Sequence, residues 1–169
     1  MSKHGDPSDD FPAAAGEAPS ASKQHPVASR LARLGAAIVD AVLALAIALP
    51  IGFVTGYLQR VLDQTASVGE MAVQAVAGMI IFLLLHGYLL ATRGQTIGKM
   101  LLGVRIVDYN TDQLLSFGKL IGLRVVPVWM VSLIPFAGGC LVLIDTLFIF
   151  GNERRCIHDL IAGTKVVQA

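Results

Sequence analysis

Long runs of apolar residues dominate the chain after residue 30, and the few polar residues inside them are widely spaced. About 20 apolar residues in a helix cross a hydrocarbon core of roughly 30 Å. Two runs reach this length, Leu34–Leu58 and Met71–Thr92. A third, Phe117–Phe150, is too long for one straight span and contains Pro135–Gly139, where proline and paired glycines favour a tight turn. The pattern predicts four transmembrane helices; the alternative is three spans, the last being one kinked helix.

Two short stretches follow a different pattern. Gly103–Asp108 and Gly163–Gln168 alternate β-branched and polar residues, as half-buried strands do. We expect these strands to pair at the membrane surface, because an isolated two-stranded element is marginal and needs the helix ends as support. The predicted fold class is an all-α membrane protein, a four-helix transmembrane bundle with a small cytoplasmic two-stranded β element.

Lysine and arginine are unevenly distributed among the loops. They lie before the first apolar run, between the second and third, and after the last. The loop between the first two runs holds only Arg60, beside Asp63 and Glu70. By the positive-inside rule the amino terminus, the middle loop and the carboxyl terminus are cytoplasmic, which requires an even number of crossings and favours four helices.

The composition agrees with a chain whose main solvent is lipid. Of its 169 residues, 54% are hydrophobic and 15% are charged, and the mean hydropathy is +0.67. A net charge of +1 gives no global field that favours nucleic acid. Residues 1–29 lack apolar periodicity and are predicted to be a disordered cytoplasmic tail, followed by a transmembrane domain over residues 30–169. Cys140 and Cys156 flank opposite ends of one apolar run, too far apart for a disulfide, and both are expected to be inert.

Four ionisable residues, one from each predicted helix, fall at a similar depth. Counting from the cytoplasmic ends of the helices places Asp40, His86, Arg124 and Asp145 about 9 to 11 Å inside. A charge near the middle of a bilayer costs about 2.5 to 3.5 kcal/mol, so these side chains are expected to face one another. We expect Arg124 to lie between Asp40 and Asp145 and to bind both carboxylates, with His86 setting the charge balance. Arg33 shares a helix face with Asp40 but is two turns away, so a direct bond is not expected.

This polar layer admits two interpretations of equal weight. In the first, Asp40, Asp145 and His86 bind an ion or proton, with Arg33 and Arg124 as charge partners. In the second, the same groups only hold the bundle together through buried hydrogen bonds. Charge inside a membrane shifts the weight towards function.

Other motifs add less. Gly52 and Gly56 form a small-xxx-small step that favours close helix packing, either within the bundle or in a homodimer. Gly94–Met100 departs from a phosphate-binding loop in spacing and in lacking Ser or Thr after its lysine; it is expected to shape the chain as it leaves the second span. His158 and Asp159 suggest metal or catalytic ligands, but no third ligand stands at suitable spacing, so a capping or surface hydrogen-bonding role is favoured. No nucleophile pattern is present, so we predict no enzymatic activity. We also expect no metal and no cofactor.

Three stretches taken together resemble the RDD family of small bacterial membrane proteins, named for one arginine and two aspartates. These are Arg33–Asp40, Gly94–Asp108 and Leu143–Val167. The resemblance covers nearly the whole chain after the tail, and it implies that Arg33, Asp40 and Asp145 are the three naming residues. It also implies a multi-pass protein of the bacterial cytoplasmic (inner) membrane.

The family resemblance implies a range of functions. Some members are described as sodium/proton antiporters, and others as membrane subunits of larger complexes. We therefore expect cation/proton transport, with the lipid bilayer, a monovalent cation or proton and a homo-oligomer or larger membrane complex as partners. The alternative is a membrane scaffold or assembly subunit without transport activity.

Overall fold

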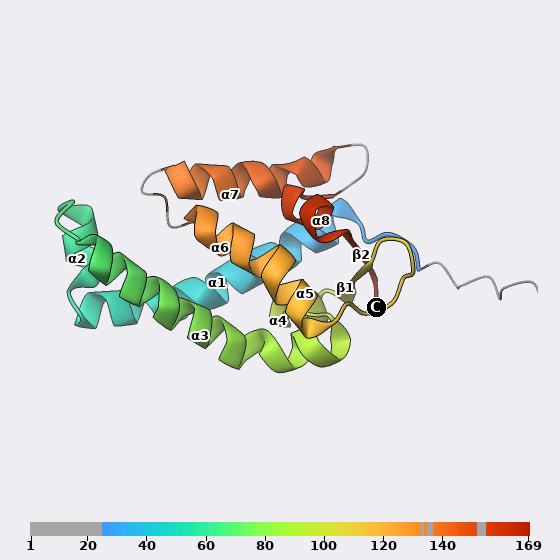
Figure 1. The fold of residues 1–169 in the computed structure, drawn as a ribbon, viewed down its shortest axis with the longest axis horizontal. Helices are drawn as coiled ribbons and strands as arrows, with labels where there is room; N and C mark the ends of the chain where they lie inside the picture. Colours follow the sequence, from blue (N-terminus) through green and yellow to red (C-terminus); the bar gives the residue numbers. More distant parts are fainter. Residues whose placement is uncertain (1–24, 133, 135–136, 152–154) are drawn as a thin grey trace, which may run out of the picture.

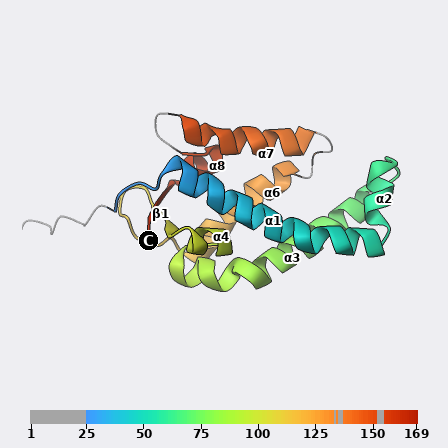
Figure 2. The same ribbon diagram turned by 180° about the vertical axis from the view of Figure 1, so that it is seen from behind.

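The computed structural model describes residues 25–132, 134, 137–151 and 155–169. Its elements in chain order are α1 Arg30–Val54, α2 Tyr57–Leu62, α3 Val68–Arg93, α4 Ile97–Leu101, β1 Val104–Asp108, α5 Phe117–Leu120, the π-helical turn η1 Ile121–Val125, α6 Val126–Ser132, α7 Ala137–Leu147, the 3₁₀ turn η2 Phe148–Phe150, α8 Ile157–Ala162 and β2 Thr164–Gln168. The molecule is elongated, with α2 at one end and the two strands at the other (Figures 1 and 2).

The two longest helices correspond to the first two predicted spans. Within the described residues, α1 with 25 residues and α3 with 26 are the helices long and apolar enough to cross a membrane. Ser29 caps the start of α1 by accepting the Ala32 N–H, and Ser67 and Glu70 form a capping box at the start of α3. The helix α1 ends at Val54, earlier than expected, because Gly56 adopts a φ of 68° and begins the separate helix α2.

The third apolar region forms two helical segments that lie side by side. The segment α5–η1–α6 runs through residues 117–132, and α7 returns alongside α6 (Figure 1). The alternative of one kinked helix is therefore wrong. Of the predicted turn, Pro135 lies outside the described residues, whereas Gly138 and Gly139 belong to the first turn of α7.

The predicted strand pair is confirmed. β1 and β2 are antiparallel, with Val104 opposite Gln168 and Asp108 opposite Thr164. Val27 adds an isolated bridge to Val167 on β2, and Ala28 is fully buried. Residues 25–29, which the sequence assigns to the tail, are thus packed against the sheet; residues 1–24 of that predicted tail lie outside the described residues.

The buried core lies at the sheet end of the molecule. Its residues come from the segment before α1 and from α1, α3, β1, α5 and β2. They are Ala28, Ala36, Leu90, Val104, Ile106, Leu120 and Val166. In contrast, many large apolar side chains on α1 and α3 are exposed, including Val42 and Leu84 at 60% and 79%. The fold therefore positions a packed sheet and short helices against the ends of longer helices whose apolar faces are uncovered.

Candidate functional site

A fully buried carboxylate, Asp159 on α8, joins three parts of the chain. Arg33 from α1 and Arg124 from η1 each donate to one of its two oxygens, Oδ2 and Oδ1 respectively. Thr164 at the start of β2 donates its hydroxyl to Oδ1 at 3.1 Å, and the Cys156 N–H donates to Oδ2 at 3.2 Å. Because Asp159 stands in the first turn of α8, the same side chain caps the helix and neutralises the arginines.

The charge of Asp159 is strongly favoured in the fold. Burial alone would raise the pKa of this carboxyl, but the charges of Arg124, His158 and Arg33 outweigh it and hold the pKa well below its ordinary value. A buried carboxylate with two arginines and two further donors is fully paired, so we assign it a structural role. We call Arg33, Arg124, Asp159 and Thr164 the arginine clamp.

The position of Arg124 corrects the sequence prediction. We expected it between Asp40 and Asp145, but its Nη1 donates to Asp159 and, at 2.7 Å, to Thr164 Oγ1. Arg124 lies within the π-helical turn η1, and such turns are frequent at functional sites. Arg33 likewise finds its partner in Asp159. The expected surface role of Asp159 is wrong, whereas its capping role is confirmed.

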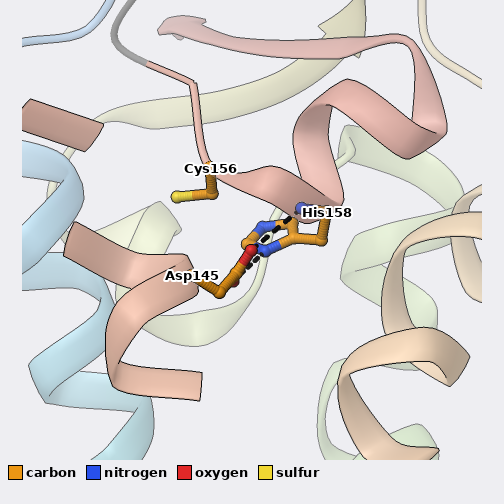
Figure 3. A group of neighbouring side chains, drawn as sticks. All are labelled: Asp145, Cys156 and His158. Atoms are coloured by element: carbon orange, nitrogen blue, oxygen red, sulfur yellow. Dashed lines mark hydrogen bonds and ion pairs between the residues drawn. The ribbon is translucent and has the colours of Figure 1, made fainter. Parts of the chain in front are cut away.

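A second polar pair connects α7 and α8. The His158 N–H donates to Asp145 Oδ1 at 2.9 Å, and the His158 ring nitrogen Nδ1 is in hydrogen-bond contact with Asp145 Oδ2. In Figure 3 the imidazole faces the carboxylate, and Cys156 lies beside them on the segment that leads into α8. Burial lowers the pKa of His158, and the nearby Arg124 adds to this effect, although Asp145 opposes it.

The third polar group surrounds Asp40 on α1. Its carboxylate accepts the Thr96 hydroxyl at 2.5 Å and the Gly98 N–H at 2.7 Å, and His86 Nε2 on α3 lies 3.4 Å from Oδ1. Gly98 allows this approach, since a Cβ at that position would stand 2.2 Å from the Ala36 carbonyl oxygen. His86 is 4% exposed, and among the described residues its Nε2 is a buried nitrogen that has no hydrogen-bond partner within the usual geometry.

Asp40 opens onto a cavity of about 240 Å³. Polar groups from α4 with its N-cap, η1 and α8 line it together with Asp40, namely Thr96, Lys99, Arg124 and His158. Apolar side chains, among them Phe82, Leu120 and Trp129, form the rest of the wall. Burial and the charge of Arg124 lower the pKa of Lys99 to about 8, while the charges of Asp40 and Asp159 oppose this shift. The cavity thus combines one carboxylate with a lysine whose proton is weakly held.

The predicted layer is therefore divided between three groups. Asp40 and His86 come together, as expected, but Asp145 pairs with His158 and Arg124 with Asp159. Sequence reasoning passed over Thr96 and Lys99 as site residues. A signal was available, because Gly94–Met100 follows the second span directly and its polar residues had no assigned partner.

The glycine motif is also corrected. Gly52 is buried in α1, but a Cβ there would contact Leu58, which follows in the same chain. Gly56 lies outside α1 with a left-handed backbone, so the two glycines do not form one helix face. In contrast, Gly94 and Thr96 do shape the chain where it leaves the second long apolar helix: Gly94 ends α3 with a φ of 64° and Thr96 caps α4.

Both cysteines are free, Cys140 exposed and Cys156 buried. Burial raises the pKa of the Cys156 thiol to about 11, so this thiol is protonated at neutral pH.

Together the fold and the polar groups define a small helical protein in which two long apolar helices, α1 and α3, end on a compact polar cap held by the arginine clamp. The chain belongs to the RDD family, whose family model matches residues 27–163. This family is membrane-associated, in agreement with the two apolar helices.

A relative from Haemophilus influenzae, described as an uncharacterized protein, is 32% identical over 102 residues. The match covers 60% of this chain and 62% of the relative, so the chain spans less than two thirds of that protein's length. No solved structure matches the chain.

Proposed function

We propose that this chain is a multi-pass protein of the bacterial cytoplasmic membrane that exchanges a monovalent cation for a proton at the Asp40 cavity. The observation that carries this proposal is the placement of Asp40 and Lys99 on the wall of one cavity of about 240 Å³. His86 Nε2, buried and without a hydrogen bond, stands 3.4 Å from Asp40. Ionisable groups of this kind mark ion and proton pathways in membrane proteins, and the lowered pKa of Lys99 makes its proton easier to release than that of an exposed lysine.

The membrane placement is supported by length and surface. α1 and α3 exceed the roughly 20 residues that cross a bilayer, and their exposed apolar side chains would contact lipid. Residues 117–132 and 137–150 form shorter helical segments, which would complete four crossings with local thinning of the bilayer. The sheet end gathers the basic loops and is assigned to the cytoplasm by the positive-inside rule.

Cation binding would use oxygen ligands. Asp40 and the Thr96 hydroxyl both line the cavity, and hard cations prefer carboxylate and other oxygen ligands. A bound cation would replace the Thr96 hydroxyl proton as the partner of the carboxylate oxygen, while the Gly98 N–H continues to hold the other oxygen in position.

Proton release would follow from the charges around Lys99. The negative charge of Asp40 is one of two that keep Lys99 protonated. A cation that neutralises Asp40 removes this contribution, so the pKa of Lys99 falls further below about 8 and the amine gives up its proton. The reverse sequence reloads Lys99 and expels the cation. One chain encloses little space for a pathway, so we expect the exchanger to be a homo-oligomer.

The purified chain in vesicles that contain a pH-sensitive dye tests this proposal. Addition of Na⁺, K⁺ or Li⁺ should drive proton movement, and Asp40→Asn should abolish it at equal protein incorporation. Asp63→Asn is the matched control, because Asp63 is exposed at the end of α2, away from the cavity. Equal proton movement in Asp40→Asn and the unaltered chain, or none in the unaltered chain, contradicts the proposal.

A scaffold or assembly subunit is the second candidate, and the arginine clamp favours it. Asp159 is saturated by its partners and ties α1, η1 and β2 together, which is the behaviour of a rigid frame. In that case no purified preparation moves ions, and Asp40→Asn lowers the abundance of the protein or the recovery of a companion in a mild-detergent pulldown. Isolation of the chain without any companion counts against this candidate.

A further inference from the structure

We propose that Asp145, Cys156 and His158 form a binding site for a divalent transition metal ion of the Zn²⁺ type. One donor atom from each side chain lies within 4.8 Å of the other two. Figure 3 shows the imidazole of His158 against the Asp145 carboxylate, with Cys156 beside the pair. His158 also lines the Asp40 cavity, but the three proposed metal donors differ from the Asp40 and Thr96 oxygens proposed to bind a cation there.

The three donors select the class of metal. Thiolate, imidazole and carboxylate together are a ligand set of Zn²⁺ and Co²⁺, whereas Mg²⁺ and Ca²⁺ take oxygen ligands alone. The carboxylate of Asp145 and the thiolate of Cys156 cancel the charge of a divalent ion. The bound site is therefore neutral, whereas the metal-free site, with a protonated thiol, carries the single negative charge of Asp145.

The local geometry accommodates an ion with small side-chain movements. His158 Nδ1 and Asp145 Oδ2 are in hydrogen-bond contact, and the ion would take the place of the proton between them. Metal bonds of about 2.0 Å to nitrogen and oxygen require these two atoms to separate slightly. A fourth position is available, because an adjacent cavity of about 190 Å³ has Asp145, Ile157 and His158 in its wall and can supply water as a ligand.

The proton balance is simple. The proton on His158 Nδ1 moves to Nε2, which lies 3.7 Å from Asp159 Oδ1 and gains a carboxylate acceptor there. Such a carboxylate behind a metal-bound histidine orients the ring. Cys156 loses its thiol proton to solvent when its sulfur binds the ion. Each metal ion bound therefore releases one proton, with no change of oxidation state.

Co²⁺ added to the metal-free purified chain in detergent tests this site, because thiolate ligation gives a sulfur-to-cobalt charge-transfer band and tetrahedral Co²⁺ gives visible absorption. We expect one Co²⁺ per chain and displacement by Zn²⁺. Cys156→Ser should abolish the charge-transfer band, whereas Cys140→Ser, which alters the exposed thiol, should keep it. Asp145→Asn should weaken Zn²⁺ binding at least tenfold in competition with a coloured chelator.

We expect Cys156→Ser to fold normally. Residue 156 is the N-cap of α8, and serine is among the favoured N-cap residues, so Cys156→Ser should unfold at the same temperature as the metal-free unaltered chain. A band that persists in Cys156→Ser, a band lost in Cys140→Ser, or no band in the unaltered chain overturns the proposal. None of these results depends on ion movement across vesicles.

Discussion

Replacement of Asp159 by asparagine tests the assignment of the arginine clamp as the main structural anchor of the fold. The carboxylate is 0% exposed and receives both Arg33 and Arg124. Asn keeps the size of the side chain but leaves two buried guanidinium groups near each other without a negative partner. Removing one member of a buried charge pair costs about 3 to 5 kcal/mol, because the remaining charge is left uncompensated. We expect Asp159→Asn to lose stability by this amount.

Thermal unfolding in detergent measures the loss. The single tryptophan, Trp129 on α6, packs over Gly78 of α3 and reports on helix contacts by its fluorescence. For a chain of this size the expected loss corresponds to a midpoint lower by about 6 to 20 °C. Asp63→Asn, at an exposed carboxylate, should leave the midpoint within about 2 °C of the unaltered chain.

A double-mutant cycle separates this cause from a general loss of packing. Arg124→Gln combined with Asp159→Asn removes both an arginine and its carboxylate, so the double variant should be more stable than the sum of the two single losses predicts. A midpoint for Asp159→Asn equal to that of Asp63→Asn, or strictly additive losses in the cycle, would refute the role assigned to the clamp.

Two further changes test the contacts around the Asp40 cavity. Gly98→Ala should destabilise the chain by about 1 to 3 kcal/mol and reduce proton movement. The reason is that its Cβ would lie 2.2 Å from the Ala36 carbonyl oxygen and force α4 away from α1. Gly87→Ala is the control: a Cβ at Gly87 would have nothing within 4 Å, so this variant should unfold no earlier than the unaltered chain. Lys99→Met should stabilise the chain at neutral pH. In the unaltered chain the folded pKa of Lys99, about 8, lies below the ordinary 10.5, so the unfolded state binds this proton more tightly. The stability of the unaltered chain therefore rises as the pH increases from about 8 to 10.5. Melting midpoints at several pH values should show this rise in the unaltered chain and a smaller one in Lys99→Met; identical slopes contradict the placement of the lysine.

The elements that follow from local pattern could be predicted. Two helices came from the length of the apolar runs, and β1 and β2 came from alternation in Gly103–Asp108 and Gly163–Gln168. The early end of α1 was less accessible, since Gly56 was interpreted as a packing residue within a continuous helix. Its left-handed backbone depends on the turn to α2, which hydropathy does not encode.

The polar partners were harder to predict because depth along a helix does not fix direction around it. Counting residues placed Arg124 and Asp145 at one level, but the π-helical turn and the short helix α8 decide which carboxylate each side chain meets. The strongest acceptor, Asp159, lies after the last apolar run and outside the helices that were counted. The burial of an acidic residue in a terminal segment cannot be predicted from hydropathy, because it depends on that segment folding back onto the helix ends.

The two carboxylates differ in their surroundings: Asp159 is surrounded by donors, whereas Asp40 faces a cavity. Both oxygens of Asp159 accept from donors, which come from Arg33 on α1, Arg124 on η1 and Thr164 on β2. Asp40 faces a cavity, and the nearest imidazole nitrogen has no hydrogen bond. Arg124 belongs to both surroundings, since it binds Asp159 and also lines the Asp40 cavity. If the proposed cation binds at Asp40, the charge changes in the same cavity that Arg124 lines, and we propose this shared cavity as the route by which the ion would alter how the helices are held together.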